Sequence, residues 1–409
     1  MQRSLLLISV SLLFPFLFWG CATSPCHDAA TRYQSRYPDA DTIEKVLQQE
    51  LLSPGNPPSK NRIPGAQVVY GNRDRVLYSA VYGRLSSDSP DTPENLVTPD
   101  TLFDLASLTK PVVTATGIML LNERGLLKLN DSISKYLPEY MGTALSDITI
   151  EELLRHRSGL ADTPEINNTQ GASVLARVRA GEDMKAFYLK GIPEFLNPSK
   201  RGGFSYSDLG YILLATVIER LSGLPLDRFA EKEIFTPLGM KQSSFLPPPE
   251  TSTCARAWRR CLVNDNTVYF YLGGTGGSAG AYSTAGDIAI FARMILNRGM
   301  LKEAGGSRKQ FLKPQSVDAM TSDAAHSENL RGLGWDIDTA YSCAPRGSFP
   351  VGSFGHTGYT GTSLWIDPES GLFVVILTNE VDAKKGLINP VRWKIAEIVQ
   401  RGAGGLPSK

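Results

Sequence analysis

The stretch Phe103–Pro111, "FDLASLTKP", places a serine and a lysine three positions apart, with a proline directly behind the lysine. Residues at this spacing lie on one face of a helix, so we expect Ser107 and Lys110 to touch if a helix runs through them. Proline lacks the N–H that a helix interior needs, but the first turn of a helix tolerates it. Pro111 therefore places the start of a helix at or just before Ser107.

A serine and a lysine at this spacing are not specific by themselves. The chain contains a second pair, Ser132 and Lys135, in the polar turn "LNDSISKYLPEY". Asp131 and Ser132 in this turn are residue types typical of helix caps. Ser107 instead follows a strand-like stretch and opens a long apolar helix that ends near Gly125. We therefore interpret Ser107 as the candidate nucleophile.

A lysine that acts as a base needs support, because making Lys110 neutral at pH 7 costs roughly 4.6 kcal/mol from its ordinary pKa. A second polar group that relays the proton is therefore expected. Tyr206 in "FSYSDLGY" stands in a loop immediately before a strong helix and can supply it. The alternative is an ordinary tyrosine in a surface loop.

A third candidate motif is "GHTGYTGTSLW", in which His356 and Gly358 begin a strand. A glycine there lets a substrate backbone lie close against a strand edge. Single histidines are more often structural, and we interpret His156 in "LLRHRSGL" in that way, since it ends a helix ahead of Gly159.

Composition is that of an ordinary globular protein of 409 residues, with 42% hydrophobic residues, 20% charged residues and a net charge of +1. This balance gives no electrostatic reason to propose a nucleic-acid partner. The cysteines at 26, 254, 261 and 343 match no zinc-binding spacing, so we expect no metal and no cofactor. An oxidising compartment permits a disulfide between Cys254 and Cys261, and scattered thiols fit the spacing equally well.

The N-terminus has the features of a targeting segment. Arg3 precedes the apolar run Leu5–Trp19, which is short for a membrane span, and the run ends at Gly20–Cys21. This ending resembles a lipobox, which predicts an exported lipoprotein attached to the membrane through Cys21. An ordinary signal peptide or a short anchor is the alternative.

The remaining pattern predicts strands at both ends of the chain and helices between them. We expect a tether with one helix near 42–52, two strands around a turn at 71–74, helices near 173–189, 207–222 and 285–296, two strands around a turn at 367–371, and a closing helix from about 390.

Three motifs, Ser107-Leu-Thr-Lys110, Tyr206-Ser-Asp208 and His356-Thr-Gly358, resemble in order and spacing those of the serine β-lactamase-like superfamily. This superfamily contains class C β-lactamases, low-molecular-mass penicillin-binding proteins, D-aminopeptidases and esterases. The resemblance runs from about 62 to 400. It implies an α/β (α+β) fold with an antiparallel sheet flanked by helices and an inserted all-helical domain. The expected divisions are 1–20 signal peptide, 21–60 lipid-anchored tether, 61–127 with 265–400 as the α/β domain, and 128–264 as the helical insertion.

The resemblance also implies roles for the motif residues. Ser107 is the expected acylated nucleophile, Lys110 its proton acceptor or electrostatic partner, and Tyr206 the general base that also protonates the leaving group. The backbone N–H groups of Ser107 and of Tyr359, just past Gly358, are expected to form the oxyanion hole.

Two residues depart from the superfamily pattern. The second motif commonly ends in asparagine, whose amide can donate a hydrogen bond to a substrate carbonyl; the carboxylate of Asp208 cannot. The third motif often begins with lysine, which attracts a substrate carboxylate; His356 carries that charge only if its pKa is raised. Asp208, His356, Gly358 and Tyr359 are therefore the expected substrate-binding residues, and the departures weaken the case for an efficient β-lactamase.

The function that the resemblance implies is acyl transfer through Ser107 in the cell envelope, on the periplasmic side or the cell surface. A D-Ala-D-Ala carboxypeptidase or endopeptidase acting on peptidoglycan peptides is expected first, with β-lactams as acylating ligands. An esterase acting on small acyl esters, or a weak β-lactamase, is the alternative. A non-catalytic penicillin-sensing or wall-binding lipoprotein is the alternative from another class.

Overall fold

The computed structural model describes residues 63–90, 92–162, 180–247, 253–302, 307–380 and 388–403. The predicted signal peptide 1–20, Cys21 and the tether with its helix near 42–52 lie outside the described residues, as does the part 173–179 of the predicted helix 173–189. The rest of that prediction overlaps α6 (Met184–Gly191).

The centre of the fold is a seven-stranded antiparallel sheet with the order β2-β1-β12-β11-β10-β9-β8. Its strands are β1 (Gly65–Asn72), β2 (Val76–Gly83), β8 (Leu330–Arg331), β9 (Asp336–Asp338), β10 (Phe354–Thr357), β11 (Ser363–Asp367) and β12 (Leu372–Thr378). Because β1 pairs with β12, the sheet is built from both ends of the described chain, as the sequence predicts. Short strands pair elsewhere: β3 (Phe103–Asp104), β4 (Ser244–Phe245) and β5 (Ala281–Ser283) in one sheet, β6 (Met300–Lys302) and β7 (Arg308–Gln310) in another.

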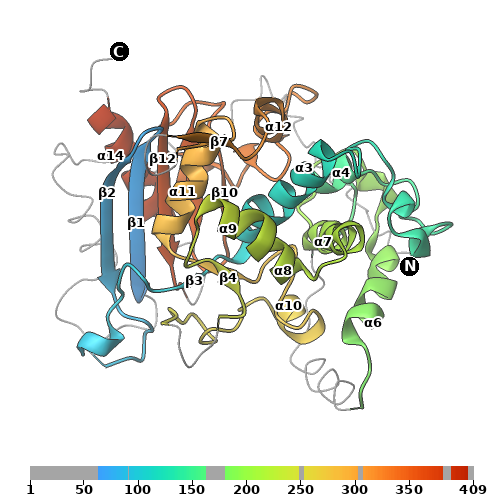
Figure 1. The fold of residues 1–409 in the computed structure, drawn as a ribbon, viewed down its shortest axis with the longest axis horizontal. Helices are drawn as coiled ribbons and strands as arrows, with labels where there is room; N and C mark the ends of the chain where they lie inside the picture. Colours follow the sequence, from blue (N-terminus) through green and yellow to red (C-terminus); the bar gives the residue numbers. More distant parts are fainter. Residues whose placement is uncertain are drawn as a thin grey trace, which may run out of the picture.

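The side chains of β12 point alternately to the two faces of the sheet, and both faces are covered. Phe373 and Val375 belong to the main core, whereas Val374 and Ile376 belong to a second core together with Ile395. Successive side chains of a strand point to opposite faces, so every residue of this apolar strand is buried. Figure 1 shows α11 (Ala285–Leu296) lying across β1 and β12. On the other face, α14 (Asn389–Ala403) packs on β12 and on α13 (Cys343–Arg346).

Most of the remaining helices gather beside the sheet (Figure 1). They include α3 (Thr116–Glu123), α4 (Ile150–Leu154), α6 (Met184–Gly191), α7 (Asp208–Ser222), α8 (Leu226–Ala230), α9 (Thr236–Leu238) and α10 (Asn266–Tyr271), while α12 (Pro314–Met320) lies near β7 in this view. The predicted limits of α7 are confirmed, because Ser207 caps its start and Gly223 ends it at φ 70°. The domain limits 61–127, 128–264 and 265–400 stay a prediction.

Within the described ranges, no single helix is long and apolar enough to cross a membrane, although α7 and the segment Leu226–Leu238, bent by 75°, together have the necessary length and composition.

Candidate active site

The candidate nucleophile lies at the junction of a strand and a helix. After β3, residues Ala106–Leu108 form a tight turn, Lys110–Ala115 continue with wider helical turns, and α3 follows. The predicted helix start at Ser107 is confirmed, with Pro111 in the opening turns. Ala106 has a φ of 47°, a left-handed conformation that is uncommon for a residue with a Cβ atom. The chain is therefore held in a sharp bend directly before Ser107.

Lys110 is completely buried behind the nucleophile. Its Nζ donates to Ser107 Oγ at 3.0 Å and to the carbonyl oxygen of Ser278 at 3.0 Å, and it lies 2.5 Å from Asp208 Oδ1. The buried ammonium group is therefore surrounded by oxygen atoms, one of them a carboxylate oxygen. The structure thus brings Ser107, Lys110 and Asp208 into one chain of contacts.

The charge on Lys110 follows from these contacts. Burial lowers the pKa of the ammonium, but the Asp208 carboxylate and Tyr206 raise it by more, so the pKa lies above its ordinary value. Lys110 is therefore an ammonium in the resting site, which fits an electrostatic partner better than a resting base.

Tyr206 lies over the same lysine, whose Nζ is 5.0 Å from the centre of the tyrosine ring. Burial raises the pKa of the Tyr206 phenol, and this outweighs the lowering by Lys110 and by the hydrogen bonds with Lys110 and Ser107. The direction of this pKa shift favours a protonated phenol in the resting site, and Asp208 adds to it by offsetting the lysine charge. The general-base role of Tyr206 stays a prediction. A protonated phenol is suited to protonating a leaving group.

Two further side chains position Tyr206, and sequence reasoning missed this role for both. The ring of His156 stacks on that of Tyr206 at 4.4 Å, and its Nδ1 accepts a hydrogen bond from the backbone N–H of Ser207 at 3.0 Å. The guanidinium carbon of Arg331, which is 1% exposed, lies 5.8 Å from the centre of the Tyr206 ring. His156 is structural as predicted, but what it supports is the candidate site.

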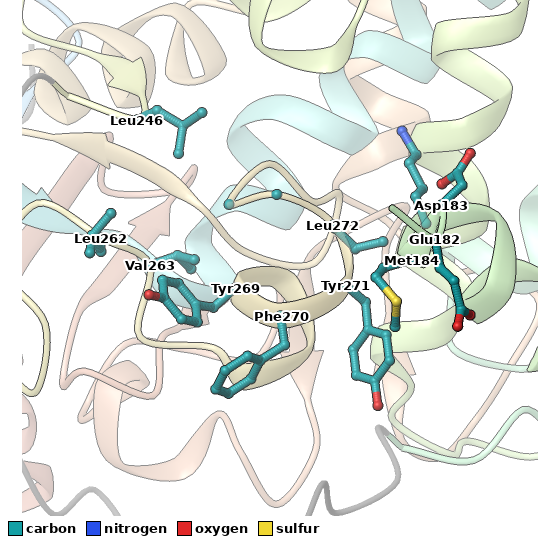
Figure 2. Close-up of a pocket in the computed structure, with 13 residues that line it drawn as sticks. Glu182, Asp183, Met184, Leu246, Leu262, Val263, Tyr269, Phe270, Tyr271 and Leu272 are labelled. Carbon is teal, nitrogen blue, oxygen red and sulfur yellow. The ribbon is translucent and has the colours of Figure 1, made fainter. Parts of the chain in front are cut away.

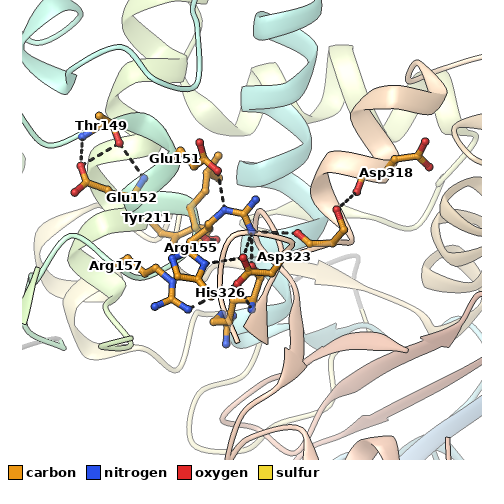
Figure 3. Close-up of polar contacts among 12 residues, drawn as sticks. Thr149, Glu151, Glu152, Arg155, Arg157, Tyr211, Asp318, Asp323 and His326 are labelled. Carbon is orange, nitrogen blue, oxygen red and sulfur yellow. Dashed lines mark hydrogen bonds and ion pairs between the residues drawn. The ribbon is translucent and has the colours of Figure 1, made fainter. Parts of the chain in front are cut away.

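A polar cluster around His156 and Arg331 joins the helices to the sheet (Figure 3). Asp323 accepts the backbone N–H of Arg331 at 3.0 Å, and it lies 3.6 Å from the guanidinium of Arg155 and 3.7 Å from that of Arg157. Arg155 also donates to the backbone carbonyl of Arg331. These contacts fix both sides of His156, since Arg155 and Arg157 flank it in the chain. The local sequence does not indicate this role of Arg155 and Arg157, because their partners lie about 170 residues away in the chain.

The surroundings of His356 disfavour the positive charge that would attract a substrate carboxylate. The ring is 3% exposed, and its Nδ1 contacts the carbonyl oxygen of Thr357 at 2.7 Å. Burial, together with the positive charges of Arg331 and Lys110, lowers its pKa well below the ordinary value. This direction is the opposite of the raised pKa that a cationic His356 would need, and a substrate-binding role of His356 stays a prediction.

Close packing requires a glycine at position 358, which the sequence did not reveal. A Cβ atom at this position would lie 2.1 Å from Thr362 Oγ1 and 2.6 Å from the carbonyl oxygen of Leu105. The glycine therefore allows the turn after β10 to approach the bend before Ser107. Tyr359 follows it and is 44% exposed. Participation of its N–H in an oxyanion hole stays a prediction.

Several of the predicted residues share one cleft with a volume of about 340 Å³. Its lining includes Ser107, Tyr206, Asp208, Trp258, Asp265 and Tyr359. Among the described residues that line it there is no lysine or arginine. A larger groove of about 620 Å³, shown in Figure 2, is lined by residues such as Leu262, Tyr269 and Phe270 and does not include Ser107.

The competing pair does not form a comparable site. Lys135 Nζ lies 2.8 Å from Asp131 Oδ2, and the lysine side chain is 57% exposed. Asp131 accepts the backbone N–H of Lys128, but the predicted cap role of Ser132 is wrong, because its side chain makes no capping hydrogen bond. The preference for Ser107 over Ser132 is thus supported by the complete burial of Lys110 and by the contact between Ser107 and Lys110.

The structure also decides between the alternatives for two cysteines. Cys254 and Cys261 form a disulfide, and Cys343 is buried. Within the described ranges no cluster of three or more histidine, cysteine, aspartate or glutamate residues is arranged to hold a metal ion.

A serine beside a buried ammonium, a tyrosine and an antiparallel strand defines the site of an acyl-serine hydrolase. A family model described as "Beta-lactamase" matches residues 40–396, and the chain belongs to this family. It is a serine hydrolase of penicillin-binding type with the expected β-lactamase-like fold.

Named relatives agree with this assignment. The chain is 28% identical over 352 residues to the "Putative D-alanyl-D-alanine carboxypeptidase" of Escherichia coli (strain K12), covering 78% of each chain. It is also 28% identical to the "N-acetylmuramyl-L-alanine amidase" of Bacillus subtilis (strain 168), covering 78% of this chain and 77% of the relative. A penicillin-binding protein homologue from Caulobacter crescentus has a similar fold, with a TM-score of 0.64 at 19% identity, covering 88% of this chain and 96% of that one.

Proposed function

We propose that the protein hydrolyses D-Ala-D-Ala peptides of the cell wall, as a carboxypeptidase or endopeptidase, through an acyl-enzyme on Ser107. The observation that carries this proposal is the 3.0 Å contact between Ser107 Oγ and the buried Nζ of Lys110. The name of the relative from Escherichia coli supports the substrate class.

The contacts suggest a route for the protons. Ser107 Oγ attacks the substrate carbonyl carbon while its proton passes to Lys110, and Lys110 passes one of its own protons to Asp208. The Tyr206 phenol protonates the leaving nitrogen as the C–N bond breaks, and the proton held on Asp208 returns to Tyr206 through Lys110. Water then attacks the ester by the reverse route, which frees Ser107.

The charge lining the cleft favours a second candidate, an esterase acting on neutral acyl esters. A D-Ala-D-Ala terminus carries a carboxylate, whereas His356 is neutral and the described cleft residues include no lysine or arginine. A neutral ester needs no cation there.

One assay separates these candidates. Purified protein and Ser107→Ala would be given an acylated D-Ala-D-Ala peptide, p-nitrophenyl acetate and a chromogenic cephalosporin. Release of D-alanine that depends on Ser107 supports the peptidase. Ester hydrolysis without D-alanine release supports the esterase, and a stable acyl-enzyme without turnover supports the penicillin-sensing alternative.

We further propose that the protein is exported to the cell envelope and attached to the membrane through a lipid on Cys21. The support is the short apolar run that ends at Gly20–Cys21. A Cys21→Ala variant is expected to leave the detergent phase in a partition experiment. Unchanged partitioning would contradict the lipid attachment.

A further inference from the structure

A short loop closed by the disulfide lies beside the strand that leads to the nucleophile. The loop joins Cys254 to Cys261. At its start, the carbonyl oxygen of Thr253 accepts the N–H of Leu102 at 2.8 Å, and the N–H of Ala255 donates to the carbonyl oxygen of Leu102 at 2.8 Å. Both cysteines are buried against Leu102. The loop is therefore fixed next to β3.

Buried hydrogen bonds connect this loop to the bend before Ser107. Asn264 Oδ1 accepts the N–H groups of Trp258 and Arg259 at 3.0 Å each. The backbone N–H and side-chain amide of Asn264 donate to Asp104 Oδ2 at 2.8 Å each, and Asp104 Oδ1 accepts the N–H of Ala106 at 2.9 Å. Asp104 and Asn264 are each 4% exposed. The backbone of Trp258 thus has a fixed position relative to the nucleophile.

The side chain of Trp258 is placed by the same loop at the mouth of the cleft. It lines the cleft together with Ser107 and Tyr206, and it is 45% exposed. Its ring lies 5.4 Å from that of Tyr359, which is 44% exposed. Large aromatic side chains that stay this exposed on a rigid support are typical of binding surfaces.

We propose that Trp258 and Tyr359 form a subsite for an aromatic or other flat apolar substituent of the substrate. This inference rests on the proposed acyl-serine function, since the substituent must be attached to the group that reacts with Ser107. The larger groove in Figure 2 is a weaker candidate, because it shares no lining residue with the cleft and does not include Ser107.

Three thioesters test the subsite: S-ethyl thioacetate, S-ethyl phenylthioacetate and S-benzyl thioacetate. The second carries an added phenyl group on the acyl side, and the third has a phenyl group in place of the terminal methyl group on the leaving side. The released thiol is measured for each. We expect kcat/KM of the wild type to be about tenfold higher for one of the two aromatic thioesters than for S-ethyl thioacetate, after correction for uncatalysed hydrolysis.

Variants then assign that preference to the aromatic pair. Trp258→Ala is expected to remove most of the preference through a higher KM, whereas Trp258→Phe retains part of it. Phe187→Ala is the matched control, because Phe187 is 46% exposed but does not line the cleft. Thermal unfolding of each variant shows whether it is folded.

The outcomes separate this inference from the proposed function. Absence of a preference for either aromatic thioester, or a preference that survives in Trp258→Ala, would overturn the subsite. If the wild type releases thiol at the same rate as Ser107→Ala, the proposed function itself fails.

Discussion

Replacing Asp208 with asparagine would break the ion pair that keeps Lys110 charged. The two charged atoms are 2.5 Å apart, the lysine side chain is fully buried and that of Asp208 is 16% exposed. Their direct attraction is roughly 7 kcal/mol at an effective dielectric constant of about 20, before desolvation is counted. Removing one partner of a buried pair typically costs about 3–5 kcal/mol of unfolding free energy. We expect a loss of this size for Asp208→Asn at pH 7.

The pH dependence of that loss has a definite sign. In the wild type, the raised pKa of Lys110 stabilises the fold at all pH values below the ordinary lysine pKa, and this is lost only as pH rises through the folded value. In Asp208→Asn, only Tyr206 still opposes the effect of burial, which is the largest single influence, so the folded pKa is expected to fall below the unfolded one. The variant should therefore gain stability as pH rises towards 10. Because neutral Lys110 then becomes the base, its kcat/KM should rise over the same range.

Urea unfolding at pH 7 and at pH 9.5, with ester hydrolysis at both, measures these effects. Asp265→Asn is the matched control, since Asp265 also lines the cleft and asparagine can keep its cap contact with the N–H of Val268. A stability difference between wild type and Asp208→Asn that stays constant with pH would refute the assigned role of the ion pair.

Three further outcomes are expected. Gly358→Ala should lower both the melting temperature and kcat, because the added Cβ would lie 2.6 Å from the carbonyl oxygen of Leu105. Lys110→Ala should lower kcat/KM by about 10²-fold or more, whereas Lys135→Ala should leave it unchanged, as kinetic assays of both variants would show. Hydrolysis of an anionic and a neutral ester should have parallel pH profiles between pH 6 and 8, because burial and nearby cations keep His356 neutral; a selective gain for the anionic ester near pH 6 would contradict this.

The local sequence was sufficient to predict features that depend on residues within one helix or one motif. Pro111 located the helix start, and the apolar periodicity of 207–222 located α7, which the structure places at Asp208–Ser222. The order of the three motifs identified the family, and the strands at both ends were confirmed as one sheet.

Long-range contacts decided what local sequence could not. The local sequence indicates only that Asp208 cannot donate a hydrogen bond to a substrate carbonyl. Nothing near it in sequence indicates that it contacts Lys110. The lowered pKa of His356 comes from its burial and then from Arg331, which belongs to another strand. Likewise, Asp104 lies inside the stretch Phe103–Pro111, but its partner Asn264 is 160 residues away.

Covalent labelling tests the central claim most directly. The full chain would be treated with a labelled fluorophosphonate and with a labelled penicillin, and the modified peptide would be identified by mass spectrometry. The acyl-serine mechanism predicts a label on Ser107 that is lost in Ser107→Ala and unchanged in Ser132→Ala. A label on Ser132, or undiminished labelling of Ser107→Ala, would contradict it.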